Sequence, residues 1–146
     1  MAAGGTRVDF YLLADSNISS VRLFCCRLAE KAWKLGHRVW IRTDNAETTR
    51  LLDDVLWTFS DGSFVPHAKV TDSEAEHSPV LIGDSAPRIG INLLINLGSD
   101  VPEFCDAYPR IAEIINADDA LKQLGRVRYA HYQKSNYTLE HHTINQ

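Results

Sequence analysis

The sequence begins with a strand-like segment, a helix-like segment and a second strand-like segment, joined by short turns. Val8–Leu13 (VDFYLL) is an aromatic and aliphatic run of the kind that forms a strand. Apolar residues then recur at helical spacing from Val21 to Leu35, and Ser19 or Ser20 precedes them as the expected N-cap. Because parallel strands need a crossover connection, usually a helix, this order predicts a parallel α/β sheet.

The same alternation continues beyond the second strand. That strand, Arg38–Arg42 (RVWIR), has an apolar centre suited to the middle of a sheet, and Asp44 with Glu47 resembles a capping pair that opens a helix reaching Leu56. Three more strands are expected further on, at Pro79–Ile82, Gly90–Leu97 and Arg110–Asn116. The segment from 90 to 97 is apolar almost throughout, as expected for a strand buried on both faces. We therefore predict a single α/β domain over residues 1–146, with a mostly parallel sheet flanked by helices.

Composition is that of an ordinary globular protein, with 45% hydrophobic and 23% charged residues. No run approaches the ~18 apolar residues of a membrane-spanning helix. The opening MAAGGTRVDF lacks the basic start and apolar core of a signal peptide, so we expect a cytoplasmic protein without a membrane partner. Cys25, Cys26 and Cys105 are odd in number and form no CxxC motif, which favours reduced, buried thiols over a zinc site.

Motifs for catalysis or cofactor binding are missing from the sequence. The loop after the first strand, Ala14–Ser19, has neither glycine nor lysine, so it cannot form a phosphate-cradling loop of the GxxxxGK or GxGxxG type. There is no GxSxG and no HExxH, and Cys25 and Cys26 fall inside a predicted helix. His141 and His142 lie in a C-terminal tail that we expect to fray. These observations predict no enzyme, cofactor or metal site, and leave a nucleotide-dependent enzyme as a weak alternative.

One predicted helix, Asp118–Ser135, carries an unusual distribution of charge. Four cations and no acids lie between residues 120 and 139, although the whole chain has a net charge of −4. At ~100° per residue one broad face is expected to hold the apolar side, at Leu121, Leu124, Val127, His131 and Tyr132. The opposite face holds Lys122, Arg126, Tyr129 and Gln133.

Three details of this helix bear on its function. Cations beside Tyr129 suit a partner with acidic side chains and an apolar or carboxylate end, or alternatively a single-stranded nucleic acid. Gly125 costs about 1 kcal/mol relative to Ala in a helix, which would be offset if it permits close approach of a neighbour. Arg128 falls towards the apolar side, as either a binding residue or a boundary salt bridge.

The segment Trp57–His67 (WTFSDGSFVPH) combines aromatic residues with an Asp–Gly turn and has no periodicity. Two interpretations remain open. The segment is a loop folded over its own core, or it is an exposed apolar patch for a protein partner.

Four blocks of the sequence resemble the chi subunit of bacterial DNA polymerase III, in their order and spacing as well as their residues. The blocks are Phe10–Leu13 (FYLL), Leu52–Trp57 (LDDVLW), Ser63–His67 (SFVPH) and Ala120–Tyr132 (ALKQLGRVRYAHY). The segment Asp72–Arg88 matches nothing in that pattern.

The resemblance implies a fold like a mononucleotide-binding domain and a non-catalytic adaptor of the clamp loader that contacts DNA only indirectly. It implies one surface for the psi subunit, or for another protein where psi is lacking, at Trp57, Phe64, Val65 and Pro66. It implies a second surface for the acidic, Phe-terminated C-terminal tail of single-stranded DNA-binding protein, at Lys122, Arg126, Tyr129 and Ile115. Ala130 and Gln133 stand where the family has a lysine and an arginine, and Lys134 is a candidate to replace them.

Overall fold

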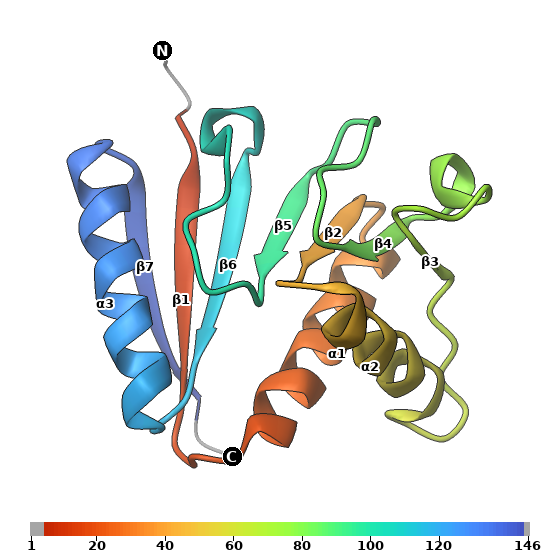
Figure 1. Cartoon of the computed structure of the whole chain (residues 1–146), viewed down its shortest axis with the longest axis horizontal. Coiled ribbons are helices and arrows are strands. Elements are labelled where there is room, and N and C mark those ends of the chain that lie inside the picture. The colour runs from red at the N-terminus through yellow and green to blue at the C-terminus, as the bar shows by residue number, and fades with distance from the viewer. Residues whose placement is uncertain (1–4, 145–146) are drawn as a thin grey trace.

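The computed structural model of the chain describes residues 5–144, which form one open sheet with helices on both faces (Figure 1). The seven strands of these residues are β1 Arg7–Leu13, β2 Val39–Arg42, β3 His67–Lys69, β4 Val80–Gly83, β5 Leu93–Asn96, β6 Arg110–Ile115 and β7 Thr138–Ile144. Their order across the sheet is β3-β4-β2-β5-β6-β1-β7, and every pair is parallel. The α/β fold with a parallel sheet is therefore confirmed.

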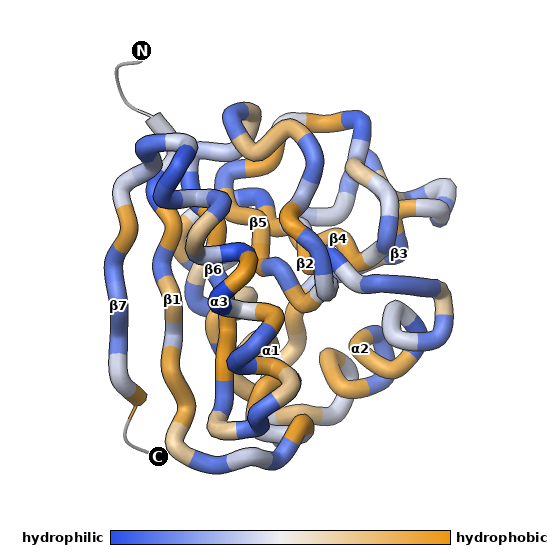
Figure 2. The backbone as a smooth tube through the Cα atoms, turned by 60° about the vertical axis from the view of Figure 1, so that its left-hand side comes forward, coloured by the Kyte–Doolittle hydropathy of each residue, from blue (hydrophilic) through white to orange (hydrophobic). Residues whose placement is uncertain are grey.

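Three α-helices lie within the described residues: α1 Ile18–Lys34, α2 Ala46–Thr58 and α3 Asp119–Lys134. Two short 3₁₀ turns, η1 Ala75–His77 and η2 Cys105–Ala107, interrupt the loops. Helices α1 and α2 cover one face of the sheet, where Cys25 and Leu52 pack against Ile41. Helix α3 covers the other face, where Tyr132 packs against Phe10. In Figure 2 the central strands β5, β2 and β4 are mostly hydrophobic, whereas the edge strand β7 is largely hydrophilic.

The helix caps differ from those predicted for α1 and α2. The N-cap of α1 is Asn17, whose side chain accepts a hydrogen bond from the Ser19 backbone N–H, rather than Ser19 or Ser20. The N-cap of α2 is Asn45, which forms a reciprocal capping box with Thr48. The carboxylate of Asp44 instead accepts hydrogen bonds from the backbone N–H and the hydroxyl of Ser99. Both errors are shifts of one to three residues, because several polar side chains in a row can each cap a helix.

The expected frayed tail at His141 and His142 is wrong, since both residues belong to β7. This strand pairs with β1 along its whole length, with Phe10 opposite His141. Polar residues fill most of β7 because it is an edge strand with only one protein neighbour, so its sequence lacks the apolar run of a buried strand. The short edge strand β3 escaped prediction for a similar reason, and β5 is shorter than the expected 90–97 segment.

The predicted orientation of α3 is also wrong in part. The residues buried on this helix are Gly125, Arg128 and Tyr132, whereas Leu124 is 39% exposed and Val127 is 66% exposed. An arginine can occupy a buried position here because its guanidinium forms an ion pair with a buried carboxylate of the sheet. The N-cap is Asp118, as predicted, and its carboxylate accepts a hydrogen bond from the Leu121 N–H.

The three cysteines are free and buried, as predicted. Burial raises the pKa of the Cys26 thiol to about 12 and that of Cys105 to about 11, so neither is a reactive thiolate at neutral pH. Residues 5–144 hold no cluster of His, Cys, Asp or Glu able to bind a metal ion. None of the helices in the described part of the chain is long and apolar enough to cross a membrane.

Candidate functional site

A groove of about 530 Å³ opens at the carboxyl ends of β1 and β6. The position follows from the topology. From β1, the chain crosses one face of the sheet through α1 to reach β2, whereas from β6 it crosses the other face through α3 to reach β7. The two connections leave these neighbouring strands in opposite directions, and such a switch point is where ligands of open α/β sheets bind.

The groove has an apolar floor and a cationic wall. Phe10 and Leu12 of β1 and Ile115 of β6 supply apolar surface, and the exposed side chains of Lys122 and Arg126 come from α3. Among the described residues, no Asp or Glu lines it. The arrangement suits a ligand with an apolar part and more than one negative charge.

Gly125 lies in the wall of the groove and sets how closely α3 approaches the sheet. A Cβ atom at this position would lie 2.8 Å from Cδ1 and 3.4 Å from Cγ1 of Ile115. Glycine therefore allows the helix backbone to rest on the side chain that forms the floor. The close approach predicted for this glycine is found, and its neighbour is a residue of the groove itself.

A buried ion pair also holds α3 against the sheet, one turn of the helix beyond Gly125. Nη2 of Arg128 lies 2.9 Å from Oε1 of Glu113, a β6 residue with no exposed surface. The same carboxylate accepts hydrogen bonds from Tyr132 Oη at 2.7 Å and from Asn96 Nδ2 at 2.9 Å. Burial, reinforced by the adjacent carboxylate, raises the pKa of Tyr132 far above its ordinary value, so this tyrosine remains a neutral donor. Arg128 is thus a structural salt bridge and not a ligand-binding residue, which decides between the two alternatives for it.

An aromatic cluster closes the groove on the side of β7. The ring of Tyr129 lies 5.3 Å from the ring centroids of both Phe10 and His141, and Phe10 stacks on His141 at 5.9 Å. Phe10 is almost completely buried, whereas Tyr129 is partly and His141 largely exposed. No sequence pattern predicts His141 at this site, because its partners are Phe10, 131 positions earlier on β1, and Tyr129 on a helix.

Four of the residues predicted for the tail site therefore surround one groove: Ile115, Lys122, Arg126 and Tyr129. Lys134, the fifth, is exposed in the last turn of α3 and does not line the groove. Ala130 and Gln133 are also exposed. Lys122 and Arg126 are thus the cations that a ligand in this groove would meet.

The loop between β1 and α1 presents negative charge where a nucleotide phosphate would bind. Asp15 Oδ1 accepts a hydrogen bond from the Asn17 N–H and its Oδ2 accepts one from the Ser20 hydroxyl. The Ser20 and Asn17 hydrogen bonds lower the pKa of Asp15, so the carboxylate is charged at neutral pH. A carboxylate at the N-terminus of α1 takes the place that a phosphate would need, which argues against nucleotide binding at this loop.

The predicted aromatic patch lies at the other end of the sheet, beside β3 and α2. Trp57 is 55% exposed and Phe64 is 56% exposed, with ring centroids 5.5 Å apart. Pro66 is partly buried, but Val65 has no exposed surface and belongs to the core under the patch. The assignment of Val65 to a contact surface is therefore wrong, because its apolar side chain packs in the hydrophobic core.

Trp57 belongs to the last turn of α2 rather than to a loop, and only the residues between α2 and β3 are irregular. The ring of Trp57 lies 4.7 Å from that of His67, whose Nδ1 is 2.6 Å from the Val65 carbonyl oxygen. The inner residues of the segment cover the core, as the first interpretation expects. The two large rings are exposed, and the docking of a protein partner on them stays a prediction. We call Trp57 and Phe64 the aromatic patch.

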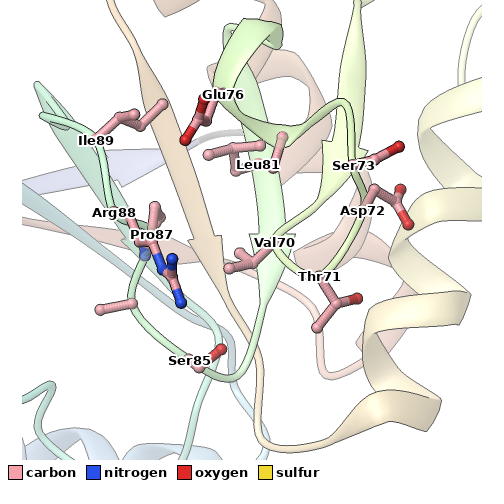
Figure 3. Close-up of a pocket in the computed structure, with 12 residues that line it drawn as sticks. Val70, Thr71, Asp72, Ser73, Glu76, Leu81, Ser85, Pro87, Arg88 and Ile89 are labelled. Carbon is pink, nitrogen blue, oxygen red and sulfur yellow. The ribbon is translucent and has the colours of Figure 1, made fainter.

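A second cavity, of about 660 Å³, lies between two loops near β3 and β4 (Figure 3). Val70, Leu81 and Ile89 give it an apolar floor, and Glu76 and Arg88 contribute opposite charges. The segment from 72 to 88 builds most of it. Its mixed charges do not select a class of ligand.

The open parallel sheet, with a cationic and apolar groove at its switch point and an aromatic patch at its far end, defines an α/β domain with two candidate binding surfaces. The chain belongs to the DNA polymerase III chi subunit family, whose model, described as "DNA polymerase III chi subunit, HolC", matches residues 6–140. Membership of this family gives the chain an accessory role in DNA replication.

Similar proteins carry the same description. The chain is 34% identical over 140 residues to the DNA polymerase III subunit chi of Pseudomonas aeruginosa, covering 95% of this chain and 97% of that protein. It is 30% identical over 136 residues to the subunit chi of Escherichia coli, covering 89% of this chain and 92% of that protein. It is 29% identical over 133 residues to that of Haemophilus influenzae, covering 90% and 92%. The family resemblance of the sequence is thereby confirmed.

Proposed function

We propose that the chain is a non-catalytic adaptor of the DNA polymerase III holoenzyme, acting in the cytoplasm. Its groove holds the acidic C-terminal tail of single-stranded DNA-binding protein. Its aromatic patch docks psi, or another protein in bacteria that lack psi, and so connects to the clamp loader. The observation that carries the proposal is the pairing of Lys122 and Arg126 with an apolar floor that no carboxylate lines among the described residues.

The chemistry of such a tail fits the groove part by part. A terminal phenylalanine ring needs an apolar slot, which Ile115 and the aromatic cluster of Phe10 and Tyr129 can provide. The terminal carboxylate and the acidic side chains before it need cations, which Lys122 and Arg126 can provide. Each exposed ion pair contributes only ~0–1 kcal/mol, so the ring and the terminal carboxylate are the anchors, and binding is modest and sensitive to salt.

Direct binding of single-stranded nucleic acid is the alternative. The burial of Arg128 in an ion pair argues against it. Of the four cations on the α3 segment, Arg128 is buried in an ion pair with Glu113. Lys122, Arg126 and Lys134 are the ones that remain exposed to a phosphate backbone. Three exposed cations on a chain of net charge −4 cannot support tight phosphate binding at physiological salt. Contact with DNA would then be indirect, through the single-stranded DNA-binding protein.

Calorimetric titration with an aspartate-rich peptide that ends in phenylalanine, with a free carboxylate, tests the groove. Arg126→Ala should weaken binding about tenfold or more, since it removes an anchor of the terminal charge. Lys134→Ala, which removes the same charge type outside the groove, should change affinity less than about twofold. Equal affinities for the wild type and Arg126→Ala would overturn the assignment. A tight titration with a single-stranded oligonucleotide would favour the alternative.

A further inference from the structure

We propose that His141 of β7 is a further binding residue of the groove, and that its imidazole, when protonated, contacts a carboxylate of the acidic peptide. This inference rests on the function proposed above and adds a residue from an element outside α3. It makes peptide affinity depend on pH in the range where histidine changes charge.

The geometry places His141 inside the groove. Its side chain lines the groove together with Lys122, Arg126 and Tyr129. It stacks on Phe10 at 5.9 Å, with an interplanar angle of 24°, and lies 5.3 Å from the Tyr129 ring. The parallel register that sets Phe10 opposite His141 fixes the ring from the strand side. The imidazole is thus held in position without being buried.

The nitrogens of this ring are available to a ligand. Within residues 5–144 the side chain of His141 makes ring contacts and no hydrogen bond. Its neighbour His142 shows the contrast, because Nε2 of that ring is 2.8 Å from Oδ1 of the buried Asp9 on the other face of the sheet. Adjacent histidines on one strand therefore have different roles: His142 is engaged in the fold and His141 faces the groove.

The charged and titratable groups that face His141 give the sign of the effect. From α3 these are Tyr129, Lys122 and Arg126, and from β1 the facing residue is the uncharged Phe10. On β7 the acidic neighbour Glu140 points to the opposite face, as alternation along a strand requires. A bound acidic peptide adds negative charge beside the imidazole and so favours its protonated form. Binding is therefore coupled to proton uptake and strengthens as the pH falls.

Other groups in the complex keep their charge over the relevant range. Aspartate side chains and a terminal carboxylate have ordinary pKa values of about 3–4, so the peptide stays anionic above about pH 5.5. Lysine and arginine stay protonated up to about pH 9. Histidine is the side chain that changes charge between about pH 5 and 8. An added charge pair at this exposed position would strengthen binding by up to about fivefold.

The test is calorimetric titration of the full chain with the acidic Phe-ended peptide at pH 6.0 and pH 8.0, at constant ionic strength. The wild type should bind about threefold to fivefold more tightly at pH 6.0, and His141→Gln should lose that difference. His131→Gln is the matched control, because His131 is an exposed histidine of α3 that does not line the groove. It should retain the wild-type difference between the two pH values. Titrations in two buffers of different ionisation enthalpy should reveal proton uptake in the wild type and none in His141→Gln.

The inference and the proposed function fail in distinguishable ways. If Arg126→Ala weakens binding but His141→Gln keeps the pH difference of the wild type, the role of His141 is wrong and the groove assignment stands. If neither variant changes the affinity at either pH, the groove is not the site and both proposals are wrong. If His131→Gln also loses the pH difference, the pH dependence comes from the overall charge of the protein, and the role of His141 is wrong.

Discussion

Gly125 of α3 rests directly on Ile115 of β6, with only 2.8 Å between the Ile115 Cδ1 atom and the point where a Cβ on Gly125 would lie. Both residues line the groove, so this contact fixes the separation of its floor and its helical wall. The position at which a side chain on α3 would displace Ile115 is thus the position that shapes the candidate site.

Gly125→Ala should weaken binding of the acidic peptide about fivefold, because the added methyl group displaces the Ile115 side chain from the floor. Overpacking typically costs about 1–3 kcal/mol, but alanine improves helix propensity by about 1 kcal/mol, so the free energy of unfolding should fall by only about 0–2 kcal/mol. Calorimetry and urea denaturation measure the two effects. The double variant Gly125→Ala/Ile115→Val removes Cδ1 and should recover part of the lost affinity; no recovery would show that this contact does not shape the groove.

Arg128→Met should destabilise the protein by about 3–5 kcal/mol, because it leaves the carboxylate of Glu113 buried without its cation. Urea denaturation monitored by fluorescence measures the loss. The matched control is Arg126→Met, which removes an exposed arginine from the same helix and should cost less than about 0.5 kcal/mol. Similar small losses for both variants would contradict the structural role of the ion pair.

The buried carboxylate of Asp9 predicts a specific pH dependence of stability. Burial raises its pKa, but hydrogen bonds from His142, Arg110 and Arg7 outweigh burial and leave the pKa below the ordinary value. A lowered folded-state pKa gives stability that is fully present above the unfolded pKa, near 3.9, and is lost as the pH falls through the folded pKa.

Asp9→Asn should therefore be less stable than the wild type at pH 7, by about 1–2 kcal/mol, since the hydrogen bonds from three side chains lose their anion. The difference should shrink as the pH falls from the ordinary aspartate pKa, near 3.9, through the lowered pKa of Asp9 in the folded protein. Unfolding free energies measured from pH 2.5 to 7 check this expectation. A difference that stays constant over the whole range would show that Asp9 has an ordinary pKa in the folded protein.

The aromatic patch should act independently of the groove. Trp57→Ala and Phe64→Ala should each weaken binding of psi from the same bacterium about tenfold, yet leave peptide affinity unchanged, because the patch and the groove lie at opposite ends of the sheet. Phe104→Ala is the matched control, since Phe104 is 77% exposed and belongs to neither surface. Unaltered psi binding by both patch variants would place that interface elsewhere.

Much of the fold was predictable because the central strands can be recognised from their local sequence alone. Residues 80–83 lie in an apolar stretch and residues 93–96 in the nearly continuous apolar run 90–97, as is typical of strands buried on both faces, and the helices between strands have clear periodicity. The edge strand β7 was not predictable in this way. It has one neighbouring strand and an exposed face, so its polar sequence resembles a tail, and its pairing with β1 joins the two ends of the chain.

The residues of the candidate site that share one helix were predictable from their spacing. Those on other elements have no spacing pattern that connects them to the site. Lys122, Arg126 and Tyr129 recur at helical spacing, and the family resemblance added Ile115. The burial of Arg128 depends on Glu113, an acidic residue within an otherwise apolar strand, and no periodicity reveals that pairing. His141 likewise enters the groove only through the register of β7 on β1.

The most direct test of the central claim is to map the bound peptide on the protein by amide chemical shifts during titration with the acidic Phe-ended peptide. The account predicts that the largest shifts cluster at Ile115, Lys122, Arg126, Tyr129 and His141, which line the groove. The amides around Trp57 and Phe64 should not move. Shifts centred on that aromatic patch, or on the cavity between residues 70 and 89, would contradict it.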